Sequence, residues 1–136
     1  MKHITLNVDD LGLSPAVNQA VCRLAALGRV HAASFMSLGR IAPDELAALR
    51  QAGIDIGLHF DLTGLARQGT LGQVMARSWL RAWPAAALQE TIARQMDAFE
   101  DQIGQPPAFI DGHQHVHQFP QVRERLLAEA RRRYGP

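Results

Sequence analysis

Along this chain, segments in which every second residue is apolar alternate with segments in which apolar residues recur at helical spacing. The pattern predicts strands and helices in alternation. Apolar residues at every second position predict strands over residues 4–8 and 54–58, and shorter apolar runs predict strands over 31–36 and 108–110. Helical spacing predicts helices over 15–27 and 43–52, one between Pro84 and Gly104, and a last one opening at Phe119-Pro120. Residues 64–72, with three glycines and little periodicity, predict a loop. This alternation predicts an α/β fold with a parallel sheet.

Polar side chains gather where three of these strands end. Asp9 and Asp10 follow the first strand, His59 follows the third, and residues 111–117 (Asp-Gly-His-Gln-His-Val-His) follow the fourth. In parallel sheets the functional loops meet at the carboxyl ends of the strands. The three clusters are therefore expected to converge on one site.

Composition narrows the classes of function. The chain has 136 residues with 47% hydrophobic and 20% charged side chains, which is typical of one globular domain. Its formal net charge of +1 gives no reason to expect nucleic acid as the main partner. No apolar run reaches the roughly 18 residues of a membrane span, and no signal peptide is recognisable, so we expect no membrane partner and a cytoplasmic location. Cys22 is the single cysteine and forms no internal disulfide.

The adjacent carboxylates Asp9 and Asp10 favour a cation site. On an extended backbone neighbouring side chains point in opposite directions, so one carboxylate can bind a metal while the other addresses a nearby water. Two neighbouring carboxylates repel each other unless a proton or a cation neutralises them. The alternative is an acidic loop that caps the helix beginning near Ser14.

The histidines supply the remaining candidate ligands. His59 ends an apolar strand, and Asp61, two residues on, would share its face and orient its imidazole. Histidines alternate at positions 113, 115 and 117, and in an extended segment they would project to one side. The alternatives are a buried or surface histidine at position 59, and a surface metal scavenger or hydrogen-bonded loop at 113–117.

Three segments resemble one known family. They are residues 7–18 (Asn-Val-Asp-Asp-Leu-Gly-Leu-Ser-Pro-Ala-Val-Asn), 57–63 (Gly-Leu-His-Phe-Asp-Leu-Thr) and 110–120 (Ile-Asp-Gly-His-Gln-His-Val-His-Gln-Phe-Pro). In order and spacing they resemble the YdjC/ChbG-like carbohydrate deacetylases. The resemblance implies a distorted (β/α) barrel related to NodB-type polysaccharide deacetylases. It also implies hydrolysis of the N-acetyl group of amino sugars, such as chitin disaccharides, with a divalent metal that is usually taken as Mg²⁺.

Carried over by the resemblance, Asp10, His59 and His113 would be the metal ligands and Asp9 the general base. Two imidazoles and one carboxylate would leave coordination positions for water and a substrate carbonyl. By ligand chemistry this set favours Zn²⁺, Mn²⁺ or Fe²⁺ over Mg²⁺, which prefers oxygen ligands. Mg²⁺ is therefore the cofactor that the resemblance implies, with Zn²⁺ as its rival.

The rest of the catalytic assignment concerns residues 111–117. The leaving amine needs a proton, and His115 or His117 would supply it. Asp111 would fix the imidazole of His113 or His115 by a hydrogen bond.

The resemblance matches only the N-terminal half of a typical member, and Leu11 stands where members usually have Phe. We therefore expect residues 1–136 to form a single domain that makes about half of a barrel. Because an open half barrel exposes a sheet edge, we expect either a fragment or a partner chain that covers the gap, as in a homodimer.

Two other functions remain open at this point. The His113-Gln-His115 spacing is similar to the His-x-His of amidohydrolases, although there the motif follows the first strand of the barrel. A truncated, non-catalytic metal-binding or association module is the second alternative.

Overall fold

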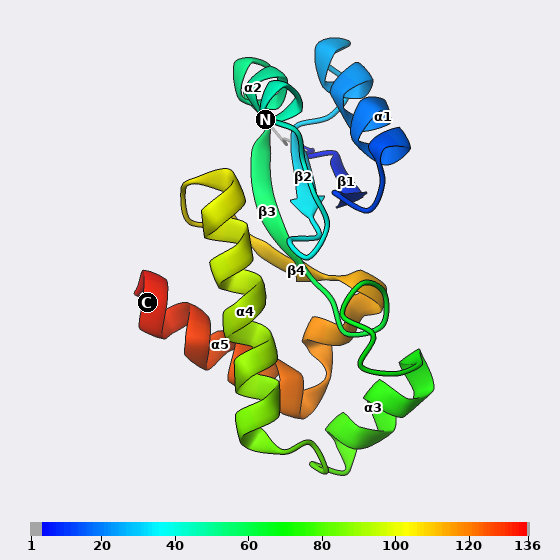
Figure 1. Cartoon of the computed structure of the whole chain (residues 1–136), viewed down its shortest axis with the longest axis vertical. Helices are drawn as coiled ribbons and strands as arrows, with labels where there is room; N and C mark the ends of the chain where they lie inside the picture. Colours follow the sequence, from blue (N-terminus) through cyan, green and yellow to red (C-terminus); the bar gives the residue numbers. More distant parts are fainter. Residues whose placement is uncertain (1–3, 136) are drawn as a thin grey trace.

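The computed structural model of the chain describes residues 4–135. Its elements follow in the order β1 (Asn7–Leu11), α1 (Pro15–Ala26), β2 (Ala32–Phe35), α2 (Pro43–Gln51), β3 (Asp55–Phe60), α3 (Leu71–Trp79), α4 (Ala85–Ile103), β4 (Ile110–Gly112), a 3₁₀ helix η1 (His113–Gln118) and α5 (Pro120–Tyr134). Figure 1 shows α1 and α2 packed together at one end of the molecule and α3 at the other.

The four strands form one parallel sheet in the order β1-β2-β3-β4, which confirms the predicted α/β fold. Each strand therefore pairs with its neighbour in the sequence, as βα units require. In this register His59 of β3 lies opposite Asp111 of β4, and Ser34 of β2 lies opposite Gly57 of β3. Among the described residues β1 and β4 are the two edges of the sheet.

The strand boundaries differ from the sequence pattern at three points that concern the polar residues. The first strand begins at Asn7 and runs to Leu11, so Asp9 and Asp10 lie inside it rather than after it. The fourth strand covers Ile110–Gly112 instead of 108–110. The third strand covers Asp55–Phe60 instead of 54–58, so His59 lies inside it. These shifts move the polar residues into the sheet, because hydrogen bonding to the neighbouring strand continues beyond the last apolar position.

Helix α3 was not predicted. Its apolar residues Leu71, Val74, Met75 and Trp79 fall at helical spacing, so the sequence does carry an amphipathic pattern, although only Val74 of the four is buried. A second signal is a capping box: the Thr70 hydroxyl accepts from the Gln73 backbone N–H at 3.4 Å, and Gln73 Oε1 accepts from the Thr70 N–H at 2.9 Å.

The core lies between the sheet and α4. Leu88, Ile92, Met96 and Phe99 share one helical stripe and are fully buried, and the Phe99 ring lies 6.1 Å from that of Phe35 on β2. This packing fixes one face of the sheet, so the polar side chains of the alternating positions stand on the other face. None of the helices within residues 4–135 is long and apolar enough to span a membrane.

Candidate metal centre

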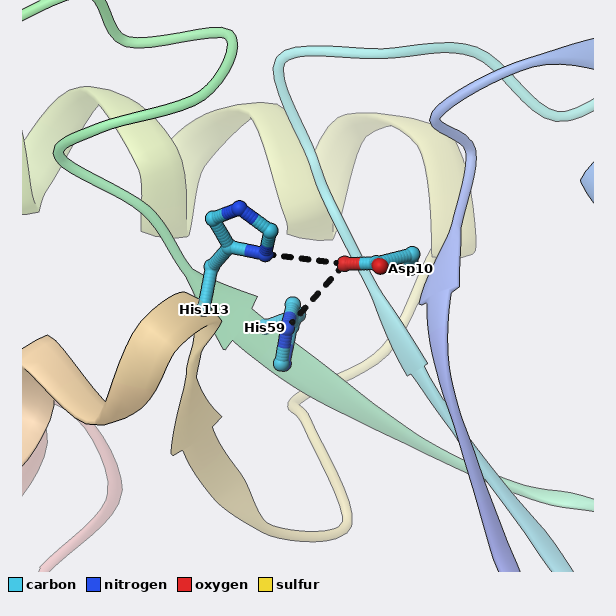
Figure 2. A group of neighbouring side chains, drawn as sticks. All are labelled: Asp10, His59 and His113. Carbon is cyan, nitrogen blue, oxygen red and sulfur yellow. Dashed lines mark hydrogen bonds and ion pairs between the residues drawn. The ribbon is translucent and has the colours of Figure 1, made fainter.

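Three side chains from distant parts of the chain meet at the carboxyl end of the sheet. Asp10 Oδ1 of β1 lies 3.0 Å from His113 Nδ1, just after β4, and 3.3 Å from His59 Nε2 on β3. The three donor atoms lie within 4.8 Å of one another, and Figure 2 shows both imidazoles beside the Asp10 carboxylate. The expected convergence of the three clusters therefore holds for these three residues.

Asp10 reaches this position because β1 is irregular there. Pairing with β2 shifts register between Val8 and Leu11, and Asp10 has φ = 65°, a left-handed backbone conformation that is rare for residues other than glycine. The fully extended backbone assumed for the two aspartates is therefore wrong at Asp10. Strain of this kind, of order 1–3 kcal/mol, is typical of functional sites.

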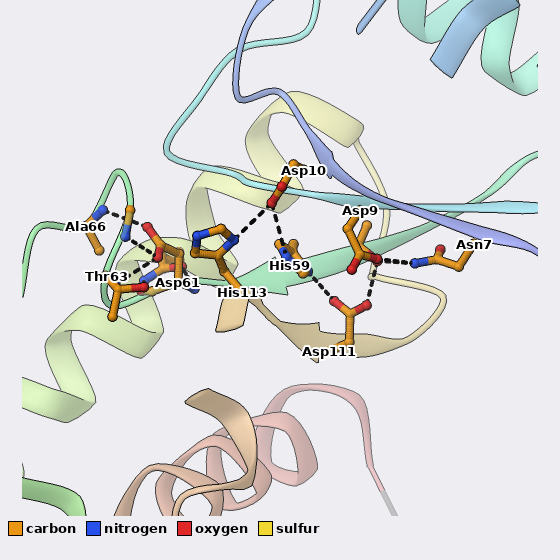
Figure 3. A network of polar contacts seen from close by, with 12 residues as sticks. Asn7, Asp9, Asp10, His59, Asp61, Thr63, Ala66, Asp111 and His113 are labelled. Carbon is orange, nitrogen blue, oxygen red and sulfur yellow. Dashed lines mark hydrogen bonds and ion pairs between the residues drawn. The ribbon is translucent and has the colours of Figure 1, made fainter. Parts of the chain in front are cut away.

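Asp9 belongs to a second cluster around the same imidazole. One ligand atom each of Asp9, His59 and Asp111 lies within 4.8 Å of the others. Figure 3 shows Asp9 and Asp10 on different sides of His59. Three carboxylates thus surround one imidazole, an arrangement that attracts positive charge in the form of a proton or a metal ion.

His59 is held in one orientation. Its side chain is only 3% exposed, and its Nδ1 lies 2.7 Å from Asp111 Oδ1. Burial by itself lowers the pKa of His59, but the hydrogen bond to Asp111 and the surrounding carboxylates outweigh it, so the pKa is raised. With Nδ1 bound to Asp111, the other ring nitrogen, Nε2, faces Asp10.

Asp111 is anchored from two sides. Burial alone would raise the pKa of Asp111, but hydrogen bonds from His59 and from the Ser34 hydroxyl, at 2.6 Å, outweigh it and the pKa is lowered. Asp111 thus orients an imidazole, but that of His59 rather than the expected His113 or His115. In-register pairing of β3 and β4 places the two side by side.

Asp61 does not orient His59. Its carboxylate accepts the backbone N–H groups of Thr63, Gly64 and Ala66 at 2.7–2.9 Å, so it stabilises the loop that follows β3. This is an Asx-type turn, in which an aspartate bonds the backbone two and more residues ahead. Residue 61 lies just beyond β3, so the strand spacing used to predict a shared face with His59 does not apply.

The histidines of 113–117 do not line up as an extended segment would require. They form η1, in which Gln114 and His115 have φ of 51° and 60°, so the backbone turns at each step. His113 joins Asp10 and His59 in the candidate metal-binding group, and His115 is exposed. His117 is half-buried and lines a cavity of about 370 Å³ with Leu126 of α5. Burial lowers the pKa of His117 despite the opposing charge of Asp111.

Two further residues at the site were missed by the sequence patterns. Asn7 Nδ2 donates to Asp9 Oδ1 at 2.8 Å and to Ser34 Oγ at 2.7 Å, which links the first strand to the Asp111 anchor. The sequence signal for Ser34 was a lone serine inside an otherwise apolar strand. The structure shows that this serine is fully buried.

The donor set fits a divalent ion. Ligands held at about 2.0–2.2 Å around a tetrahedral or octahedral ion lie about 3 Å from one another. The separations of Asp10 Oδ1 from the two imidazole nitrogens, 3.0 and 3.3 Å, match that spacing. Asp10, His59 and His113 therefore form a candidate metal-binding group.

The chain is similar in sequence to proteins named as deacetylases. The chain is 34% identical over 133 residues to a chitooligosaccharide deacetylase of Serratia marcescens, covering 89% of this chain and 53% of that protein. It is 32% identical over 135 residues to a chitooligosaccharide deacetylase of Enterobacter sp. (strain 638), covering 89% of this chain and 52% of that protein. It is 30% identical over 149 residues to a carbohydrate deacetylase of Mus musculus, covering 97% and 48%. The chain thus spans about half the length of the curated relatives it matches.

A solved structure shows the same fold. The crystal structure of a protein from Enterococcus faecalis V583, described as a cellobiose-phosphate cleavage protein, matches with a TM-score of 0.72 at 20% identity. The match covers 94% of this chain and 55% of that one. The sequence pattern of the YdjC-like proteins matches residues 3–136, which is nearly the whole chain. The chain belongs to the YdjC-like protein family.

Proposed function

We propose that the protein is a metal-dependent hydrolase that removes N-acetyl groups from amino sugars of the chito-oligosaccharide type. The observation that carries the proposal is the meeting of Asp10, His59 and His113 at metal-ligand spacing, with a further carboxylate, Asp9, beside the same imidazole. The names of the relatives supply the substrate class. Because the chain spans about half of those proteins, the activity is proposed for the protein of which this chain is the matching part.

In this proposal Asp10, His59 and His113 would hold a divalent ion. When bound, such an ion lowers the pKa of a water and polarises the acetamide carbonyl. Asp9, an exposed carboxylate fixed by Asn7, is proposed to accept the proton of the attacking water. Resemblance favours Mg²⁺ and the nitrogen-rich donor set favours Zn²⁺, so elemental analysis of protein purified without added metal decides between them.

The proton for the leaving amine is proposed to come from His115. Its side chain is exposed, two positions beyond His113, and so is free to approach a substrate. His117 is the alternative, with its ring 6.4 Å from that of His115 but half-buried in the structure. A larger loss of kcat in His115→Gln than in His117→Gln supports this assignment, and the reverse order contradicts it.

The two edges of the sheet, β1 and β4, are where further strands would pair to complete a barrel. We propose that residues 1–136 form one domain and that the barrel is completed by further strands, supplied by a second copy or by additional chain. A homodimer in light scattering supports completion by a second copy, and a monomer contradicts that version.

Acetate release from N-acetylated chito-oligosaccharides, with and without a chelator, tests the function. We expect release that the chelator stops and added metal restores. Asp9→Asn should bind metal with unchanged affinity and lose at least about 100-fold in kcat, because it removes only the proton acceptor. Asp44→Asn, an exposed change on α2, is the matched control.

Three outcomes contradict the proposal. Acetate release that the chelator does not affect would falsify the metal mechanism. Metal binding without any turnover of acetylated sugars would instead support a non-catalytic metal-binding module. Hydrolysis of unrelated amides, with acetylated sugars left intact, would support an amidohydrolase-like activity.

A further inference from the structure

Ser34 connects the two parts of the candidate site. Its hydroxyl donates to Asp111 Oδ2 at 2.6 Å and accepts from Asn7 Nδ2 at 2.7 Å. Asp111 Oδ1 is bound to His59 Nδ1, and the same Asn7 amide donates to Asp9 Oδ1. One continuous chain of hydrogen bonds therefore runs from a proposed metal ligand to the proposed general base.

The donors and acceptors in this chain of hydrogen bonds determine where each proton lies. A carboxylate only accepts, so the single hydroxyl proton of Ser34 lies toward Asp111, and the two amide hydrogens of Asn7 serve Asp9 and Ser34. Asp111, accepting the Ser34 proton at one oxygen, accepts the Nδ1–H of His59 at the other. Asp10 Oδ1 lies farther away, 3.3 Å from Nε2, so a neutral His59 keeps its proton on Nδ1 and leaves Nε2 for a metal ion.

Ser34 can contact Asp111 only if no side chain of the intervening strand stands between them. Ser34 is on β2 and Asp111 on β4, with β3 between them, and strands two positions apart are separated by about 9–10 Å. The β3 residue in register with Ser34 is Gly57, which has no side chain to block the contact. A Cβ on Gly57 would lie 2.4 Å from the Phe109 ring, so this position admits only glycine without rearrangement.

We infer that Ser34 is a positioning residue that, through Asp111, fixes His59 as an Nε2 metal donor and, through Asn7, holds Asp9 in place. The inference rests on the proposed function for the identity of the site. Hydrogen-bond partners of metal-bound imidazoles typically contribute 10–100-fold to metal affinity. Ser34 acts one step further out, so the lower end of that range applies.

Ser34→Ala is the test, with Ser37→Ala as matched control. Ser37 is also a buried serine, but it donates to the Gln95 carbonyl at 2.7 Å and takes no part in the hydrogen-bond chain. We expect Ser34→Ala to lower Mn²⁺ affinity, measured by titration calorimetry, about 10-fold. Ser37→Ala should leave Mn²⁺ affinity unchanged. Asn7→Ala removes the hydrogen bonds to Asp9 and to Ser34 but leaves the Ser34 hydroxyl bound to Asp111, so it should lower kcat more than it lowers Mn²⁺ affinity.

A second measurement needs no variant. In metal-free protein at alkaline pH, where the imidazole is neutral, ¹⁵N NMR of labelled histidine should show His59 protonated at Nδ1. Protonation at Nε2 would overturn the inference, and so would a Ser34→Ala protein with wild-type Mn²⁺ affinity. A wild-type protein that binds no metal would instead remove the proposed function, while the NMR result would still decide the orientation of His59.

Discussion

Asn18 holds the backbone two residues beyond Asp10, at Gly12. It is 3% exposed, and its Oδ1 accepts the Gly12 N–H at 2.7 Å. Its Nδ2 donates to the Arg40 carbonyl at 3.0 Å and to Glu45 Oε2 at 2.8 Å. One side chain thus ties the end of β1 to the segment between β2 and α2. Gly39 completes the contact, because a Cβ there would lie 2.0 Å from the Gly12 carbonyl oxygen.

Asn18→Ala should destabilise the protein by about 2–4 kcal/mol, because it leaves the buried Gly12 N–H without its partner and removes two part-buried hydrogen bonds, to Arg40 and Glu45. The free energy of unfolding in urea measures this. Gln19→Ala, an exposed change on the same helix, should stay within about 0.5 kcal/mol of wild type. Equal stability of the two variants would show that Asn18 does not hold this segment.

At the same scale, the sequence predicted which residues meet but not how they are held. Position at strand ends suffices to bring Asp10, His59 and His113 together, because all carboxyl ends of a parallel sheet lie at one edge. The orientation of a side chain depends on partners from other strands, which local spacing does not reveal. For this reason Asp111 was assigned to the wrong imidazole and Asp61 to the wrong task.

At the scale of elements, α5 is joined to the rest of the fold by a buried charge. Glu129 is 3% exposed, and it accepts from the Arg132 and Arg133 guanidinium groups and from Gln89 of α4. Arg133 in turn lies 2.6 Å from Asp97 of α4. Hydrogen bonds from Arg132, the largest contribution, hold the pKa of Glu129 at about 2.

This pKa predicts how stability depends on pH. A carboxylate whose pKa is lowered in the folded state stabilises the protein at pH values above its ordinary pKa of 4.5. That stability is lost as the pH falls from 4.5 toward 2. For Glu129 the loss should reach up to about 3 kcal/mol in urea unfolding. Glu129→Gln should flatten the pH dependence in this window, whereas Glu90→Gln, exposed on α4, should not. An unchanged slope in Glu129→Gln would contradict the assignment.

Element types were easier to predict than element edges. Strands with a strong alternating or apolar pattern and helices with a wide apolar stripe were found, because burial on one face sets their period. Helix α3 was missed although its apolar residues fall at helical spacing, because it begins within the glycine-containing segment 64–72. The turns of η1 depend on left-handed residues at Gln114 and His115. Neither residue is a glycine that would mark such a turn.

At the scale of the whole molecule, the chain is an open four-stranded parallel sheet with the candidate metal centre at the carboxyl end of its strands. Its relatives are about twice as long, so this centre lies in the part of the family that the chain matches. The three proposed ligands come from β1, β3 and the segment after β4, and the ion would therefore link the first strand of the sheet to the last.

Anomalous X-ray diffraction from crystals loaded with Mn²⁺ tests this account most directly. We predict one strong peak bound by Asp10, His59 and His113, with ligand distances of about 2.0–2.3 Å. A peak held instead by Asp9, His59 and Asp111, or an ion to which these histidines do not both bind, would contradict the account.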